Sequence, residues 1–382
     1  MKASDYTIVG GGVVGLSLAR ELSGRGASVT LFERRRIGEG STGIASVAAL
    51  GILIPPTRRR SPFGRLLRVS HTHYAAFCQE LLAETGRDPG YDSRGGLHLY
   101  RDPPSERTRR RLPESYRQVG VEAEWIDGES LVCRLSSAGG EFSCGLSLPS
   151  EAAVDPCALI DALVKSCHLR GVEINEGVGE VHVRRRDPVE VELADGSTAR
   201  GGTVIVACGS WTSSTLVEGM PPVVPIRGQA VELDLDLGDM PILHFDNATT
   251  DATYHILPKR EARTWVGSTV EDVGFDVGTT PEGIDELRRV AAEAFPGWLG
   301  GGSPPRLLRA WSGLRPQAGR RGGPFIGPLS EARDLWVASG HYRNGIACGP
   351  HSARLMALQL TGEELDLERD GFDAEEVQHF WP

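Results

Sequence analysis

Three glycines and an acidic residue near the start of the chain have the spacing of a dinucleotide-binding turn. Gly10, Gly12 and Gly15 follow a short apolar run, and Glu33 closes the next apolar run, 18 residues after Gly15. The first glycine permits a tight turn, the second lets the backbone approach a pyrophosphate, and the third lets a helix pack closely against a strand. A carboxylate at the position of Glu33 would accept hydrogen bonds from a ribose.

The residues around these glycines predict the strand and the helix that must position them. Ile8 and Val9 indicate a short buried strand. Residues 16–22 carry apolar side chains at helical spacing, and Gly24 and Gly26 end that helix. The N-terminal amides and the dipole of such a helix favour an anion. A glycine-rich strand–helix turn without a ligand is the alternative interpretation.

Composition and charge argue against several classes of partner. The formal net charge of −10 gives no overall attraction to nucleic acid, and no apolar run approaches the roughly 20 residues that span a bilayer. The seven cysteines are scattered without a Cys-x-x-Cys pair, which favours reduced thiols over a disulfide framework or a zinc site. Nothing before the glycine-rich turn fits a signal or transit peptide. We therefore expect a cytoplasmic protein that binds neither a metal nor nucleic acid.

Strand and helix patterns of the same kind return later in the chain, which predicts a discontinuous nucleotide-binding domain. Residues 155–170 predict a capped helix with an apolar stripe, and residues 203–209 predict a buried parallel strand that ends in glycine. Residues 335–340 predict another such strand, followed by a last helix at 345–360. We assign this domain to residues 1–80, 150–215 and 320–382.

The segments between those pieces predict a second, substrate-binding domain. Residues 223–275 contain short apolar runs separated by turn residues, as in an antiparallel sheet, and residues 281–295 predict an amphipathic helix. We assign this domain to residues 81–149 and 216–319. The sequence thus indicates an α/β fold, with a discontinuous Rossmann-type nucleotide-binding domain and a substrate domain that has a mostly antiparallel sheet.

Short motifs occur in a distinctive order over the length of the chain. They are Gly10-x-Gly12-x-x-Gly15 with Glu33, Ala45-Ser46-x-Ala48-Ala49-x-Gly51, Val154-Asp155-Pro156, Val204-x-Val206-Ala207-x-Gly209-x-Trp211, Pro225-x-Arg227-Gly228-Gln229, Trp311-x-Gly313-Leu314-Arg315-Pro316 and Gly340-His341-Tyr342-Arg343-Asn344-Gly345-Ile346. Each motif is weak alone. In this order and spacing, the chain resembles the FAD-dependent amine oxidases of the D-amino-acid oxidase group, nearest to the glycine oxidases of the thiamine pathway. The resemblance implies that the nucleotide-binding domain holds FAD, not NAD.

The resemblance also implies which residues hold the FAD. The turn at 10–15 would bind its pyrophosphate, Val178 would contact the adenine through the backbone, and the segment 340–346 would border the isoalloxazine ring, where a helix N-terminus stabilises the reduced flavin. The full expected set is Gly10, Gly12, Val13, Val14, Gly15, Glu33, Arg34, Ser41, Thr42, Ala45, Ser46, Val178, Ala207, Gly209, Trp211, Arg315, His341, Tyr342, Arg343, Asn344, Gly345 and Ile346. The segment 311–313 lacks a cysteine that could bond the flavin covalently. We therefore expect dissociable FAD.

Two arginines are the main candidates for substrate binding. Arg315 matches the carboxylate-binding arginine of the family, and a guanidinium can take a carboxylate bidentately. The alternative for Arg315 is a pair with a buried acid. The resemblance places Arg343 near the substrate, above the flavin ring. The alternative for Arg343 is an ion pair between the domains.

One position departs from the glycine oxidase pattern. When the chain is aligned on residues 256–258, His255 replaces a substrate-binding tyrosine and Thr253 replaces a histidine, with Tyr254 between them. A one-residue shift would restore the tyrosine but point it to the other face of the strand. We hypothesise that His255 enters the pocket, where it binds a carboxylate when protonated or accepts a proton from an amine. A structural histidine that faces solvent is the alternative. The candidate catalytic residues are Arg315, Arg343, His255 and Tyr254.

The resemblance implies an oxidase of small amino acids. A hydride passes from the amine-bearing carbon to flavin N5, the imine hydrolyses, and O2 reoxidises the flavin to give hydrogen peroxide. We expect glycine or an N-substituted glycine as substrate, O2 as acceptor, and an assembly compatible with the dimers and tetramers of relatives. The alternatives are a dehydrogenase or oxidase of a pathway-specific amine in specialised metabolism, and a protein that keeps the fold without this catalysis.

Overall fold

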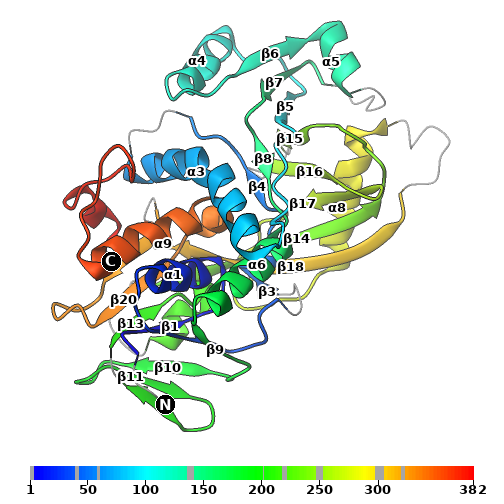
Figure 1. Ribbon diagram of the computed structural model, residues 1–382. Coiled ribbons are helices and arrows are strands. Elements are labelled where there is room, and N and C mark those ends of the chain that lie inside the picture. The colour runs from blue at the N-terminus through cyan, green and yellow to red at the C-terminus, as the bar shows by residue number, and fades with distance from the viewer. Residues whose placement is uncertain are drawn as a thin grey trace.

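The chain forms two large sheets with helices packed on them (Figure 1). The computed structural model describes residues 4–38, 43–57, 61–135, 142–200, 202–216, 222–246, 253–296, 305–319 and 323–382. No helix in this part of the chain is long and apolar enough to cross a membrane.

The first sheet has six strands, which pair in parallel except at one edge, where β19 and β20 are antiparallel. In spatial order the strands are β19 (Phe325–Pro328), β20 (Leu335–Ser339), β13 (Thr203–Val206), β1 (Tyr6–Val9), β2 (Val29–Glu33) and β9 (Glu173–Glu176). Ile8 belongs to a core with the helices, whereas Val9 packs on the opposite side of the sheet. This alternation follows from the two-residue repeat of a strand.

Different layers cover the two faces of this sheet. The helical layer consists of α1 (Val13–Gly24), α3 (Pro62–Thr85), α6 (Pro156–Leu169) and α9 (Gly345–Thr361). The other face packs against a small antiparallel sheet of β10 (Val181–Arg184), β11 (Glu190–Leu193) and β12 (Thr198–Arg200). Asp155 caps α6 by accepting hydrogen bonds from the amides of Cys157 and Ala158, as its sequence position predicts.

The second sheet has nine strands and is mostly antiparallel. In spatial order they are β3 (Gly43–Ile44), β18 (Leu307–Ala318), β14 (Val223–Asp234), β17 (Arg263–Gly267), β16 (Thr253–Lys259), β15 (Ile242–Asp246), β5 (Gly96–Tyr100), β7 (Cys144–Leu148) and β6 (Glu124–Asp127). Helix α8 (Pro281–Ala294) packs on one face through Leu287, Val290 and Ala291. Helices α4 (Glu106–Arg117) and α5 (Gly128–Leu135) lie at the β6 end (Figure 1).

Short elements complete the described chain. They are α2 (Ala45–Ala48), β4 (Ile52–Leu53), β8 (Ala152–Ala153), η1 (Gly209–Trp211), α7 (Thr212–Thr215), η3 (Tyr342–Asn344) and η4 (Glu376–Phe380). The predicted α/β fold class, with one mainly parallel and one mostly antiparallel sheet, is confirmed. The six-stranded sheet draws its strands from the three segments that we assigned to the nucleotide-binding domain. The assigned domain boundaries themselves stay a proposal.

Two long strands differ from the sequence prediction. Residues 223–234 form the single strand β14 rather than two short strands, because Gly228 stays in register opposite Gly313. The partner strand β18 was not predicted, since its glycine and Pro316 interrupt the apolar alternation. These two strands, each of 12 residues, pair with each other and carry Arg315 to the edge of the site described below.

Candidate active site

A cavity of about 910 Å³ lies between the two sheets. From the first sheet it is lined by residues at the carboxyl ends of parallel strands, where ligands bind in open α/β sheets: Val9, Glu33, Ala207 and Ser339. From the second sheet it is lined by Gly228, His255 and Arg315, on three different strands. The cavity therefore has one wall suited to a nucleotide and another wall made of side chains.

The glycine turn after β1 brings the N-terminus of α1 to the cavity. Gly10 has a φ of +116°, and a Cβ built there would lie 2.4 Å from the carbonyl oxygen of Ala207. A Cβ built at Gly15 would lie 1.9 Å from the oxygen of Gly10, so helix and strand are in direct contact. The N-cap residue of α1 is Gly12, which has no side chain to cap the helix and lines the cavity. This wall can take an anionic group on backbone amides.

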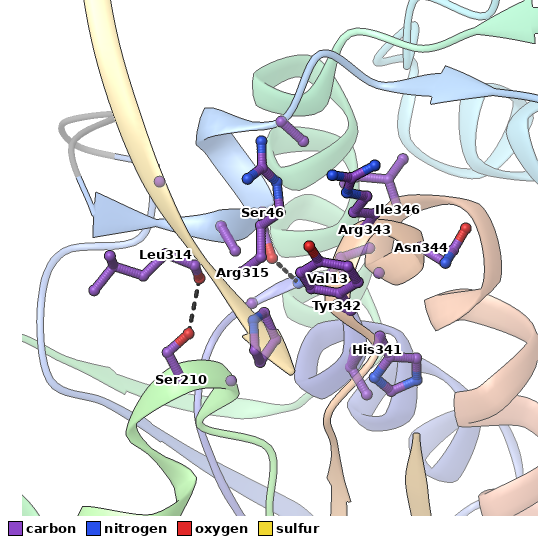
Figure 2. A pocket seen from close by; sticks show the side chains of 18 of the residues that line it. Val13, Ser46, Ser210, Leu314, Arg315, His341, Tyr342, Arg343, Asn344 and Ile346 are labelled. Carbon is purple, nitrogen blue, oxygen red and sulfur yellow. Dashed lines mark hydrogen bonds between the residues drawn. The ribbon is translucent and has the colours of Figure 1, made fainter. Parts of the chain in front are cut away.

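Two side chains fix the position of this turn. Glu33 accepts a hydrogen bond from the Gly11 amide at 2.7 Å, and its other oxygen accepts one from the Arg35 amide at 3.1 Å. The hydroxyl of Ser46, on α2, accepts a hydrogen bond from the Val13 amide at 3.0 Å (Figure 2). Glu33 and Ser46 both line the cavity, so they support the turn and remain available to a ligand.

Most of the expected cofactor residues line the cavity, and among those that the structure describes Gly15 and Val178 do not. Ser41 and Thr42 lie outside the described residues. Gly15 contacts the strand, as its spacing predicts. Val178 is not among the lining residues, and its amide donates to the carbonyl oxygen of Glu33 at 3.2 Å. The structure instead places residues 180–182 at this part of the cavity wall, which corrects the expectation for Val178.

The segment 340–346 forms a turn between β20 and α9. Gly340 and Tyr342 have φ angles of +84° and +53°, and a side chain at Tyr342 in this conformation indicates local strain at a site. Burial lowers the pKa of His341 to about 4, and its Nε2 lies 3.1 Å from the Ser352 hydroxyl. Helix α9 begins at Gly345 without a side-chain cap. Residues 341–346 therefore present a second helix N-terminus to the cavity (Figure 2).

Arg315 is a half-buried cation whose hydrogen-bond partners are all uncharged within the described residues. Its Nη1 donates to the carbonyl oxygens of Arg227 and Thr269 at 3.2 and 3.1 Å, and its Nη2 donates to the Ser268 hydroxyl at 2.6 Å. Burial, with a contribution from Arg343, lowers its pKa to about 10, so the guanidinium stays charged at neutral pH. A half-buried cation without a counterion favours an anionic ligand.

Space for this guanidinium depends on Gly228. The two residues lie on neighbouring strands, β14 and β18, with Gly228 two positions from Ile226, the direct partner of Arg315. A Cβ built at Gly228 would lie 1.9 Å from Nη2 of Arg315. This geometry explains the Arg-Gly pair of the motif at 225–229. The carbonyl oxygen of Arg227 accepts a hydrogen bond from Arg315, and the missing side chain of Gly228 leaves space for the Arg315 guanidinium.

Arg343 is exposed to the cavity. Its guanidinium lies 5.3 Å from the ring centroid of Tyr342, and in the described part of the chain it forms no ion pair. Its charge contributes to lowering the pKa values of both Arg315 and His255. Figure 2 shows Arg315 and Arg343 projecting in the same direction beside Tyr342. Two cations therefore face the part of the cavity next to the 340–346 turn.

His255 lies in the cavity wall rather than in solvent. Its Nδ1 is 2.7 Å from Nδ1 of His244 on the neighbouring strand β15. Burial, together with His244, lowers the pKa of His255 well below its usual value. The imidazole is therefore neutral at neutral pH, which does not suit the hypothesis that it binds a carboxylate as a cation.

Tyr254 does not reach the cavity, which corrects its place among the candidate catalytic residues. Successive residues of a strand point to opposite faces, and Tyr254 lies on the face that α8 covers. Its side chain is 1% exposed, and its hydroxyl donates to Glu286. Its role is in the core of the second sheet.

The sequence analysis missed three residues behind His255. His244 Nε2 lies 2.5 Å from Oε1 of Glu151, and His98 Nε2 lies 3.3 Å from Oε2 of the same carboxylate. The rings of His98 and His244 stack, with centroids 4.3 Å apart. Burial acts to raise the pKa of Glu151, but its two histidine partners outweigh this and lower it to about 2. The only sequence signal was a histidine inside each of two apolar strands.

Comparison with known proteins identifies the family. A family described as "FAD dependent oxidoreductase" (DAO) matches residues 5–359. A glycine oxidase of Pseudomonas aeruginosa is 32% identical over 366 residues, covering 94% of each chain. The crystal structure of glycine oxidase from Geobacillus kaustophilus is 27% identical, with a TM-score of 0.83 over 95% of this chain and 96% of that one.

A second crystal structure agrees on the fold. That structure, glycine oxidase from Bacillus cereus, has a TM-score of 0.82 at 24% identity and covers 96% of this chain. The predicted cofactor class is confirmed, because a family match over residues 5–359 spans both the glycine turn and the turn before α9. The chain belongs to the DAO family of FAD-dependent oxidoreductases, and it is an FAD-dependent oxidoreductase of amino acids or amines.

Proposed function

We propose that the protein oxidises glycine or an N-substituted glycine by hydride transfer to flavin N5. The products are the imine, which hydrolyses to a glyoxylate-type acid, and hydrogen peroxide formed with O2. The observation that carries the proposal is Arg315, a charged, half-buried guanidinium in the cavity wall that has no ion pair with an acidic residue among the described residues. The similarity to proteins named glycine oxidase supports the same substrate class.

The residues of the cavity fit FAD. The turn at 10–14 would take the pyrophosphate, because the start of α1 lies at the cavity wall, and Gly10 lets the turn pass the Ala207 carbonyl, which a Cβ would meet. Glu33 would hold the ribose, and residues 341–346 would border the isoalloxazine ring. When bound, FAD accepts the hydride from the substrate carbon. The volume of about 910 Å³ lies within the range of cofactor sites, roughly 300–1,000 Å³.

The protein's own contribution is to fix the substrate beside that ring. Arg315 binds the carboxylate, and the Ser268 hydroxyl accepts a hydrogen bond from its Nη2, which helps to hold the guanidinium in place. A bidentate pair in a buried wall sets the direction of the substrate as well as its distance. Arg343 adds positive charge near the same group.

We infer that the FAD is held without a covalent bond. Among the described residues, Cys208 is the cysteine that lines the cavity. Burial raises its pKa to about 12, and its thiol donates to the carbonyl oxygen of Val9 at 3.2 Å. A thiol in this state is a poor nucleophile. Acid precipitation should therefore release all of the flavin into the supernatant, and flavin retained in the pellet would contradict this inference.

The departure at His255 and Thr253 favours a second candidate substrate, a different small amine of a specialised pathway. Both residues line the cavity. A histidine in place of a tyrosine changes the hydrogen bonding offered to the amine, so a larger N-substituent or another amine could be preferred.

Anaerobic titration of the purified yellow protein with glycine, sarcosine and D-alanine tests the proposal. Bleaching of the flavin band by glycine or sarcosine, with return of colour and peroxide in air, is the expected result. Bleaching without rapid reoxidation would point to a dehydrogenase. A yellow protein that none of the three amines bleaches would refute the proposed substrate class and favour the second candidate.

A further inference from the structure

A chain of hydrogen bonds leads from the cavity wall to a fully buried carboxylate. His255 Nδ1 lies 2.7 Å from His244 Nδ1, and His244 Nε2 lies 2.5 Å from Glu151 Oε1. Glu151 and His244 are 0% and 1% exposed, whereas His255 is half-buried and lines the cavity. The three side chains come from β16, β15 and the residue before β8, so only the folded chain brings them together.

The position of each proton follows from the geometry. An ionised Glu151 can only accept, so His244 donates from Nε2. A neutral His244 then carries a lone pair on Nδ1, and His255 must donate to it from its own Nδ1. This assignment leaves a lone pair on Nε2 of His255, which has no partner among the described residues. The site therefore presents a hydrogen-bond acceptor to a ligand in the cavity.

Charged and titratable groups around His255 come from several elements. His98 on β5 stacks on His244 and contacts Glu151, Asp246 lies at the end of β15, and Arg343 lies on η3. Burial lowers the pKa values of His244 and His255, while Glu151 stays ionised. The cluster of Glu151, His244 and His255 thus carries one negative charge, and a single added proton would neutralise it.

We propose that His255 accepts a proton from the ammonium group of the bound amino acid, and that Glu151, acting through His244, orients His255 and stabilises the cation that forms. This inference rests on the proposed function. In the step, one N–H bond of the substrate breaks and a bond from that proton to Nε2 of His255 forms. The electron pair stays on the substrate nitrogen, which becomes a neutral amine. No oxidant or reductant is consumed.

The assignment also fixes the orientation of the substrate. A neutral imidazole with a free lone pair suits an N–H donor and not a carboxylate. The half-buried cation of Arg315 suits the carboxylate. The amine therefore points to β16 and the carboxylate points to β18. His255 is a catalytic residue in this arrangement, whereas His244 and Glu151 are positioning residues.

Flavin reduction measured by anaerobic stopped flow between pH 6 and 10 tests the proposal in the holoenzyme. The variants are His255→Gln and Glu151→Gln, and the control is Glu190→Gln, which alters another buried carboxylate that pairs with Arg186 away from the cavity. The substrate is whichever of glycine and sarcosine bleaches the wild-type flavin. If neither does, the proposed function fails, and the proton assignment is tested by the second measurement below.

The expected wild-type rate depends on pH less steeply than the variant rates between pH 6.5 and 9, because the bound ammonium can pass its proton to His255 within the complex, where the charge of Glu151 opposes the low pKa that burial gives His255. Both variants should be about 10²-fold slower at pH 7. Their rates should rise about tenfold per pH unit and approach the wild-type rate at high pH, since only the free amine then reacts. An equal loss at every pH would show a structural role and overturn the proposal, as would unchanged rates.

Binding of acetate separates the amine role of His255 from a carboxylate role. Acetate perturbs the flavin spectrum through the carboxylate alone, so His255→Gln should leave its Kd within about twofold, whereas loss of a charged hydrogen bond would weaken it by roughly tenfold or more. A tenfold or greater weakening of acetate binding in His255→Gln would show that His255 binds the carboxylate, and it would overturn the proposal.

A second measurement needs no turnover. Nitrogen-15 NMR of histidine-labelled holoenzyme at pH 7 should show His255 protonated at Nδ1 and bare at Nε2, with His244 neutral. Glu151→Gln should change this tautomer pattern, and Glu190→Gln should not. A His255 that carries its proton on Nε2, or a His244 protonated on both nitrogens, would overturn the proposal even if both variants fold and bind FAD.

Discussion

The nucleotide wall and the side-chain wall of the cavity are built in different ways. The nucleotide wall uses backbone amides at the starts of α1 and α9, and glycines make the approach to them possible. The side-chain wall uses Arg315, Arg343 and His255, which come from separate elements. The first wall is local in the sequence, and the second exists only through the pairing of distant strands.

The difference also appears in the electrostatics. At the nucleotide wall, the dipoles of two helices supply partial charge, and the buried His341 is neutral because burial alone lowers its pKa. At the side-chain wall, full charges are held inside the protein: Arg315 lacks an acidic partner among the described residues, and Glu151 is paired with two histidines. A wall made of backbone amides depends mainly on its glycines, whereas the other wall depends on the identity of its charged side chains.

The largest expected effect comes from Gly15→Ala, which acts on the nucleotide wall alone. Its Cβ would lie 1.9 Å from the Gly10 oxygen, so helix and turn must separate and the pyrophosphate site is lost. We expect a colourless protein that added FAD does not restore, with no measurable oxidation. Absorbance and flavin fluorescence after purification check this. A yellow variant with normal kcat would contradict the assigned role of the turn.

Arg315→Ala should have the opposite effect, because it changes the side-chain wall and leaves the nucleotide wall intact. Loss of the buried partner of a carboxylate costs about 4 kcal/mol, or roughly 10³-fold in kcat/KM. The flavin should stay bound, because the helix termini that we propose to hold it are untouched. Steady-state kinetics and the flavin spectrum give both readouts. Arg306→Ala, which removes an exposed arginine paired with Asp234, is the control and should retain full activity. Loss of flavin from the Arg315 variant would contradict the prediction that flavin binding does not depend on Arg315.

Gly228→Ala tests whether space, as well as charge, defines the side-chain wall. Its Cβ would lie 1.9 Å from Nη2 of Arg315, so the guanidinium must move while keeping its charge. We expect about a 10²-fold loss in kcat/KM, since a misplacement of about 1 Å in a positioning group has that cost. FAD should remain bound. If KM and kcat match those of the wild type, the guanidinium can bind the substrate from another position, and Gly228 is not required to make room for it.

Much of the nucleotide wall could be predicted from the sequence, because backbone binding leaves a local signature. The strand, the glycines, the helix and Glu33 lie within 30 residues and were assigned from spacing alone. The failure there concerned Val178, whose expected contact came from the resemblance and not from a pattern in the sequence. Its amide is used by the carbonyl of Glu33.

The side-chain wall could be predicted only in part. Arg315 and His255 lie in this wall, as expected from the motif at 311–316 and from the alignment on residues 256–258. The hydrogen-bond partners of these two side chains could not be derived from the motif or the alignment. Glu151 lies 93 positions before His244 in the sequence, and nothing local marks the pair. Tyr254 was predicted to belong to the site but does not reach it. A strand next to a site contributes only alternate residues to it, and Tyr254 lies on the other face of β16. Strand β18 was missed because a glycine and a proline that the site needs disrupt the strand pattern.

The smallest expected effect is a difference between the two walls in how the free energy of unfolding depends on pH. The folded-state pKa of His341 is about 4, below its usual value, because of burial. Between pH 6.5 and 4 the unfolded chain therefore binds up to one more proton at this site, and the free energy of unfolding should fall by up to about 1.4 kcal/mol per pH unit as the pH drops. That stability is fully present above pH 6.5. Urea unfolding of His341→Gln should show a smaller slope in this window.

The control for this measurement is His168→Gln, which changes an exposed histidine at the end of α6 and should leave the slope unaltered. Glu151 behaves differently. Its folded-state pKa is about 2, so its contribution to stability is present above its usual pKa and is lost only as the pH falls toward 2. The nucleotide wall should thus weaken first on acidification, with release of flavin before the side-chain wall loses its charge. Other buried histidines with a lowered pKa, such as His351, add their own contribution to the slope in both proteins. An unchanged slope in His341→Gln would therefore contradict the low pKa assigned to His341.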